Sequence, residues 1–217
     1  MFRVRPGRRQ WARGWALVLA GSLALTGASR AGGPLESVKS LIEEVQRILQ
    51  QAPHESPVQK QQRLAAIEKA AARLLDYLEM ARRSLGPTWN NLSRAQQEEF
   101  VHLFSELLKS AYAGRLDEFA HAKVVYQSEE NSQDTAEVRI SILRQNDKIP
   151  VIFRLLKEDQ DWMVYDLVVE GVSLVANYRS QFSRVMEGAS YQALVHALQA
   201  KLQADSSLTA EAGEDED

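Results

Sequence analysis

WMVYDLVVEGVSLVANYRSQF, residues 162–182, joins a strand, a turn and a capped helix within 21 residues. Residues 162–169 are apolar apart from Asp166, a pattern typical of a buried strand. Glu170-Gly171 interrupts the strand, because glycine permits a sharp turn. Ser173 then stands at an N-cap position, and apolar residues follow at helical spacing: Leu174, Val175, Tyr178, Phe182 and Val185. The stretch predicts a strand that turns directly into an amphipathic helix.

Helical periodicity dominates the chain before this stretch and returns after it. Apolar residues recur at helical spacing over about 35–49, 58–84 and 93–112. Gly86-Pro87 ends the second of these helices, and Ser93 with Gln96 forms a capping box that opens the third. Two more helices are expected, over about 173–187 and 190–203.

The period changes to two after His121. Ala136, Val138, Ile140 and Ile142 alternate with polar residues, as in a strand with one solvent-exposed face. Together with strands near 124–126, 149–157 and 162–169, this segment predicts an antiparallel meander joined by short polar turns. The order of elements indicates an α+β fold, in which helices wrap a curved antiparallel sheet of about four strands. Such a sheet encloses either a packed core or an apolar pocket, and both require inward apolar residues.

The N-terminal residues have the order of a secretory signal: positive, apolar, then small. Five arginines lie between Arg3 and Arg13, the apolar run of residues 15–26 is too short to span a membrane, and cleavage is expected after Ala28 or Ala31. We therefore expect a signal peptide over residues 1–28, one domain over 32–204 and a disordered acidic tail over 205–217. The protein is therefore expected to be exported, with the signal peptide cleaved.

The composition excludes several classes of site. The chain has no cysteine, so it has neither disulfides nor thiolate metal sites. The first 31 residues contain six arginines and no acid, so the 20 basic and 29 acidic residues of the remainder give a net charge of −9. This acidity argues against a nucleic-acid partner and against electrostatic adhesion of the protein to anionic lipid headgroups.

No catalytic motif accompanies this composition. The four histidines lack metal-ligand spacing, and no phosphate loop or nucleophile elbow occurs. Asp166 is the one carboxylate in an apolar strand, and it is either a general base or a structural group that hydrogen-bonds a nearby backbone N–H or arginine to hold the following turn. Arg179 either contacts a phosphate, pairs with Asp166 or Glu170, or lies in solvent.

Three segments together resemble the MlaC family, the toluene-tolerance auxiliary components of ABC transporters. They are LEMARRSLGPTW at 78–89, SRAQQEEFVHLFSELLKSAY at 93–112, and W..YD...EGVSL...YR.QF at 162–182. The YD…EGVS block is the most specific of them, and the likeness covers roughly residues 35–203. The resemblance implies a nuclear transport factor 2-like fold around an apolar pocket. It also implies a monomeric, non-catalytic periplasmic carrier without cofactor, whose bound ligand is a phospholipid.

The resemblance also implies partners: an inner-membrane ABC transporter with a membrane-anchored substrate-binding ring, and an outer-membrane lipoprotein or porin complex. A hopanoid-associated branch of the family is an open alternative. On the carrier hypothesis the inward apolar side chains are candidates for lipid contact, with core packing as the alternative for each: Phe104, Leu108, Tyr112, Val138, Ile140, Ile142, Val151, Phe153, Leu155, Val175, Tyr178 and Phe182. Arg179 is the candidate for the headgroup. The rival hypotheses are an enzyme of the same fold that uses Asp166 and an adaptor with a filled core.

Overall fold

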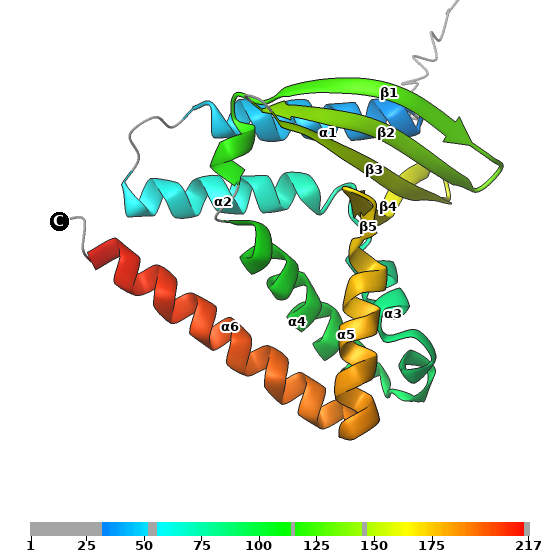
Figure 1. The fold of residues 1–217 in the computed structure, drawn as a ribbon, viewed down its shortest axis with the longest axis vertical. Coiled ribbons are helices and arrows are strands. Elements are labelled where there is room, and N and C mark those ends of the chain that lie inside the picture. The colour runs from blue at the N-terminus through cyan, green and yellow to red at the C-terminus, as the bar shows by residue number, and fades with distance from the viewer. Residues whose placement is uncertain (1–31, 52–55, 114–115, 145–146, 215–217) are drawn as a thin grey trace, which may run out of the picture. The chain divides into compact units, whose positions relative to one another are not determined.

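The computed structural model describes residues 32–51, 56–113, 116–144 and 147–214, and these form an α+β fold (Figure 1). The strands are β1 (Lys123–Asn131), β2 (Thr135–Arg144), β3 (Asp147–Glu158), β4 (Asp161–Val169) and β5 (Val172–Ser173). They form one antiparallel sheet in sequence order, so the predicted meander is confirmed. The short fifth strand was not predicted. The predicted signal peptide over residues 1–28 lies outside the described residues and stays a prediction.

The inner face of the sheet is apolar, as the alternation in β2 predicts. Val138 lies opposite Phe153, Ile140 lies opposite Val151, and all four side chains are buried. A β-bulge interrupts this alternation in β4, because Arg154 pairs with Asp166 while Leu155 pairs with Val164. The extra residue turns Asp166 to the side of the sheet that carries Arg154.

Six α-helices and two 3₁₀ turns complete the described chain: α1 (Pro34–Leu49), α2 (Pro57–Ala71), α3 (Tyr77–Leu85), η1 (Gly86–Asn91), α4 (Arg94–Ala113), η2 (Leu116–Phe119), α5 (Leu174–Gly188) and α6 (Tyr191–Glu214). The predicted capping box of α4 is confirmed, since Ser93 N donates to Gln96 at 2.9 Å and Gln96 N donates to the Ser93 hydroxyl at 3.3 Å. α6 ends at Glu214, whereas the sequence predicts an end near residue 203. The disorder expected for residues 205–217 stays a prediction.

The single helix predicted over residues 58–84 is wrong, because the chain breaks between α2 and α3. Leu75 forms a parallel bridge with Val164 of β4. Val164 N donates to the Leu74 carbonyl at 2.7 Å, and Asp76 N donates to the Val164 carbonyl at 2.9 Å. Asp76 then caps α3 by accepting from Glu79 N at 2.9 Å. These contacts with a distant strand replace the hydrogen bonds that a continuous helix would make.

The buried apolar side chains form two main groups. The sheet cluster consists of Val38, Leu74, Ala122, Ala136, Val138, Ile140, Ile142, Val151, Phe153, Leu155 and Val164. The helix cluster consists of Met80, Ala81, Leu85, Trp89, Phe100, Leu103, Phe104, Leu107, Leu108, Leu174, Val175, Phe182, Leu194, Val195 and Leu198. The half-buried Leu167 of β4 packs against both clusters. The sheet and the helical layer therefore have separate apolar interiors that meet along β4.

Glu158, beside the start of α3, makes the stability of the fold depend on pH. Its hydrogen bond to Asp76, followed by partial burial and the nearby acids, raises the pKa of Glu158 from 4.5 to about 6. The folded state therefore binds this proton more tightly than the unfolded chain, so the contribution is fully present below about pH 4.5 and is lost as the pH rises through 6.

We expect Glu158→Gln to raise the melting temperature at pH 7.5 relative to the wild type, with the difference vanishing near pH 4.5. The gain corresponds to less than about 1 kcal/mol, because Glu158 is exposed and solvent screens its charge. Thermal denaturation at several pH values measures it. The exposed Glu187→Gln of α5 is the control, and an equal effect of both substitutions would contradict the assignment.

Candidate functional site

Asp166 organises the junction between β4 and α5. The backbone turns through Glu170 and Gly171, whose φ angles are 51° and 82°. Positive φ at both positions favours glycine and matches the tight turn of a β-hairpin. The side chain of Ser173 caps α5 by accepting from Ala176 N at 3.0 Å, so the predicted cap is confirmed.

Asp166 is 3% exposed, and its carboxylate receives three hydrogen bonds. Its donors are the Ser173 hydroxyl at 2.7 Å, the Val175 backbone N–H at 3.1 Å and Arg154 Nη1 at 3.3 Å. The structural interpretation of Asp166 is therefore confirmed: the carboxylate holds the turn and the first turn of α5. Its arginine partner is Arg154 and not Arg179, the partner considered from the sequence.

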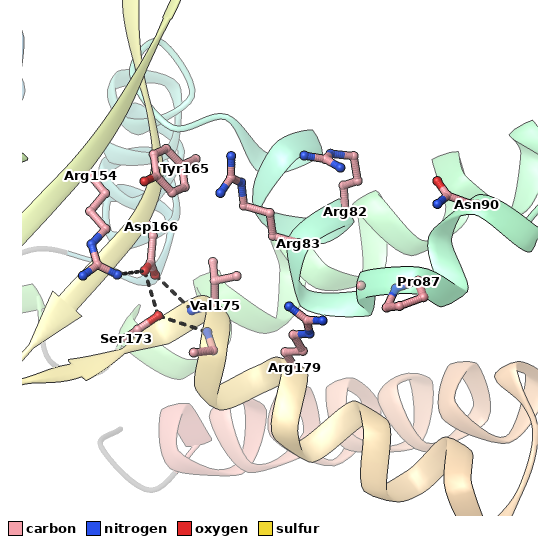
Figure 2. Close-up of a pocket in the computed structure, with 12 residues that line it drawn as sticks. Arg82, Arg83, Pro87, Asn90, Arg154, Tyr165, Asp166, Ser173, Val175 and Arg179 are labelled. Carbon is pink, nitrogen blue, oxygen red and sulfur yellow. Dashed lines mark hydrogen bonds and ion pairs between the residues drawn. The ribbon is translucent and has the colours of Figure 1, made fainter. Parts of the chain in front are cut away.

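An open pocket of about 540 Å³ lies beside this junction (Figure 2). It is lined by Arg82, Arg83, Gly86, Pro87, Asn90, Arg154, Tyr165, Asp166, Ser173, Val175, Ala176 and Arg179. Four of these side chains are guanidinium groups and one is a carboxylate. α3, η1, β3, β4 and the start of α5 all contribute to the lining, so the pocket depends on the tertiary fold. Its lining is strongly cationic within a chain of net charge −3.

Three of the four arginines are held by other groups of the protein. Arg82 donates to Glu79 at 2.5 Å and 2.6 Å, and Arg83 donates to the same carboxylate at 2.7 Å. The hydrogen bond from Arg82, more than that from Arg83, lowers the pKa of Glu79. Arg83 also stacks over the ring of Tyr165, with its guanidinium carbon 4.0 Å from the ring centroid. Arg154 joins Glu137, at 2.9 Å, to Asp166.

Arg179 differs from the other three. Across the described residues, no carboxylate forms an ion pair with it, so the pairing with Asp166 or Glu170 considered from the sequence does not occur. Its guanidinium packs against Gly86, where φ is +59°. A Cβ at Gly86 would lie 3.0 Å from Nε and 3.1 Å from Nη2 of Arg179. The absence of a side chain at Gly86 therefore makes room for the Arg179 guanidinium.

The predicted lipid-contact residues are distributed between the two clusters. The strand residues Val138, Ile140, Ile142, Val151, Phe153 and Leu155 lie in the sheet cluster. The helical residues Phe104, Leu108, Val175 and Phe182 lie in the helix cluster, and the half-buried Tyr178 packs against it. The side chain of Tyr112 lies outside the described residues. The strand candidates and the helical candidates for lipid contact thus lie in different clusters. Their role in lipid contact stays a prediction.

Aromatic rings order the helix cluster. Phe104 lies 5.4 Å from Tyr178 and 6.1 Å from Phe182 between ring centroids, both in edge-to-face orientation. Tyr191 donates to the Gln96 carbonyl at 2.9 Å, and burial, with a smaller contribution from Glu99, raises the pKa of Tyr191 to about 12. This tyrosine therefore stays neutral as a structural donor at neutral pH.

The sequence pattern singled out Asp166 and Arg179 but missed Arg82, Arg83 and Arg154. The pair Arg82-Arg83 just before Gly86-Pro87 is a signal for two cations at the C-terminal end of a helix. Nothing local indicates that Arg154, 71 positions after Arg83 in the sequence, lines the same pocket.

The described ranges contain neither a metal-binding cluster nor a helix that could span a membrane. Within residues 32–51, 56–113, 116–144 and 147–214, no group of three His, Asp or Glu side chains could hold a metal ion. None of the helices in those ranges is long and apolar enough to cross a membrane.

Comparison with known proteins gives three findings. The family model described as MlaC protein matches residues 39–200. The intermembrane phospholipid transport system binding protein MlaC of Haemophilus influenzae is 26% identical over 121 residues, which are 53% of this chain and 56% of that relative. This chain thus spans about half the length of that relative. A phospholipid-binding protein of Ralstonia solanacearum, solved in complex with a phospholipid, has a TM-score of 0.72 and 20% identity, with 79% of this chain and 98% of that chain covered, and so shares the fold.

Proposed function

Since the chain belongs to the MlaC family, we propose that it is a phospholipid carrier of an intermembrane transport system. The relative from Haemophilus influenzae supports this proposal, because it is named as the binding protein of a phospholipid transport system. The structural neighbour supports it as well, because that protein was solved with a phospholipid bound. The proposal assigns the chain no catalytic step and no cofactor. Its ligand is a phospholipid.

The division of the apolar interior is the structural observation that carries the proposal. A diacyl lipid exposes on the order of 30 methylenes, at ~0.8 kcal/mol each, so its passage through water is opposed by more than ~20 kcal/mol. A carrier must replace water along the acyl chains without binding them irreversibly. We place the acyl chains between the sheet cluster and the helix cluster, which are separate except where Leu167 contacts both.

The location and partners follow from the same hypothesis. The proposed signal peptide of residues 1–28 directs the chain to the periplasm, where it acts as a monomer. There it exchanges lipid with an inner-membrane ABC transporter bearing a membrane-anchored ring and with an outer-membrane lipoprotein or porin complex. Arg179 contacts the phosphate of the headgroup. The hopanoid-associated branch is tested by the same experiment, which identifies the bound lipid.

Purification followed by native mass spectrometry and lipid extraction tests the proposal. We expect the purified protein to carry diacyl phospholipid, or to take it up from vesicles of defined composition at close to one lipid per chain. A protein that is reproducibly empty and takes up no lipid contradicts the carrier function and leaves the enzyme and adaptor hypotheses. Recovery of hopanoids in place of phospholipids assigns the chain to the other branch.

A further inference from the structure

We propose that the arginine pocket of α3, β3 and α5 is a binding site for a phosphate group and selects anionic phospholipids. The headgroup part of this inference rests on the proposed carrier function, whereas the phosphate site itself does not. The pocket has a volume of about 540 Å³, and its lining includes Arg82, Arg83, Arg154 and Arg179. That volume is ample for a phosphodiester with its polar substituent.

The charge balance of the pocket indicates an anion. The carboxylates that pair with its arginines are Glu79, Glu137 and Asp166, three groups against four guanidinium groups, and Glu137 is also shared with Arg139 outside the pocket. One positive charge therefore lacks a carboxylate among the described residues. Asp166, the one acid of the lining, is 3% exposed and accepts from three donors, so it presents little negative charge to a ligand. A singly charged phosphodiester complements this balance.

The arginines are also preorganised as donors. Arg83 is fixed between Glu79 and the ring of Tyr165 through its Nε and its face, which leaves its terminal nitrogens as donors. Arg179 is exposed and keeps its fork of donors, while its guanidinium rests on Gly86. Planar guanidinium groups on two facing helices can contact different oxygens of one phosphate. The N-terminus of α5 is not the anion site, because Asp166 and Ser173 already accept from its first N–H groups.

This arrangement predicts selectivity among headgroups. Phosphatidylglycerol and phosphatidylcholine both carry a phosphodiester, but only phosphatidylcholine adds a cation beside it. The guanidinium groups of Arg82 and Arg83 would repel that cation. We therefore expect the pocket to prefer phosphatidylglycerol by about two- to fivefold, the range for one charge interaction at an exposed site.

The lipid arm of the test uses vesicles of equal phosphatidylglycerol and phosphatidylcholine with identical acyl chains. The protein is incubated with the vesicles and repurified, and the ratio of the two bound lipids is measured by mass spectrometry. Arg179→Gln should bring the ratio close to one, because the phosphate is then no longer held where Arg82 and Arg83 meet the choline cation. Arg184→Gln, on the same helix but outside the lining, should keep the wild-type ratio.

The second arm measures the melting temperature in inorganic phosphate and in chloride at equal ionic strength. We expect phosphate to stabilise the wild type and Arg184→Gln, but not Arg179→Gln. Loss of both effects in Arg179→Gln supports a headgroup site, and loss of the phosphate effect alone supports a site for free phosphate. If Arg179→Gln matches the wild type in both arms, the proposal is wrong. If the wild type takes up no lipid, the carrier function fails while the phosphate arm still tests the pocket.

Discussion

Replacing Asp166 by alanine should lower the free energy of unfolding by about 3 kcal/mol, because it removes a buried carboxylate that satisfies three donors. The Val175 N–H at the start of α5 is buried and would lose its acceptor. Arg154 would keep only Glu137, and Ser173 would lose the partner of its hydroxyl proton. Denaturant titration followed by circular dichroism measures the change.

Two further variants test whether the loss comes from this hydrogen-bond network or from any substitution in β4. Asp166→Asn keeps a carbonyl oxygen that can accept from Val175 N, so its cost should be about 1 kcal/mol. Asp161→Ala removes an exposed acid at the start of the same strand and should change the stability by less than about 0.5 kcal/mol. Equal losses for Asp166→Ala and Asp161→Ala would show that the network contributes nothing.

The same residue distinguishes the carrier from an enzyme. In the carrier, Asp166→Asn leaves lipid uptake largely intact, since asparagine can still accept from the Val175 N–H and all four arginines of the pocket remain. In an enzyme that uses Asp166 as a base, this substitution abolishes turnover. Three donors of the protein already occupy the carboxylate, and this structural engagement favours the first outcome.

Local sequence signals correctly predicted the helix caps and turns. The structure departs from the prediction where contacts between distant segments decide it. Ser93 and Ser173 cap their helices as expected, because a cap depends on residues within one turn of the helix. The break before α3 was missed because its cause is pairing with Val164, about 90 residues away. Asp76 and Glu79 did carry a local signal for a new helix start, but the strong helix formers around them masked it.

The sequence likewise identified only those site residues that carry a local signal. Apolar alternation identified which strand residues are inward, but it could not show that the sheet and the helices bury their side chains in separate clusters. Asp166 stood out because a charge is unusual in an apolar strand. Arg82 and Arg83 did not stand out, because arginines near a helix end are ordinary on a surface. Only the packing of α3 against α5 makes them neighbours of Arg179.

Phe104→Ala should lower the free energy of unfolding of the lipid-free protein by about 4 kcal/mol, because the ring is fully buried among other aromatic rings. The substitution leaves a cavity that the neighbouring rings of Phe100, Tyr178 and Phe182 fill only in part. Phe104→Leu retains most of the volume and should cost about 1 kcal/mol. Val185→Ala, at a position 37% exposed on α5, should change the stability by less than about 0.5 kcal/mol.

Comparing the destabilisation by Phe104→Ala with and without bound lipid tests whether this ring borders the acyl chains. If the acyl chains lie against the helix cluster, their methylenes can occupy part of the cavity left by Phe104→Ala, so the lipid-loaded variant should lose less stability than the lipid-free variant. If Phe104 only packs the helices together, the loss is the same with and without lipid. Measuring both forms by denaturant titration, with Phe104→Leu as the reference, therefore tests whether this ring borders the acyl chains. Equal losses in both forms would place the acyl chains away from Phe104, because a methylene beyond contact distance cannot refill the space the ring vacates.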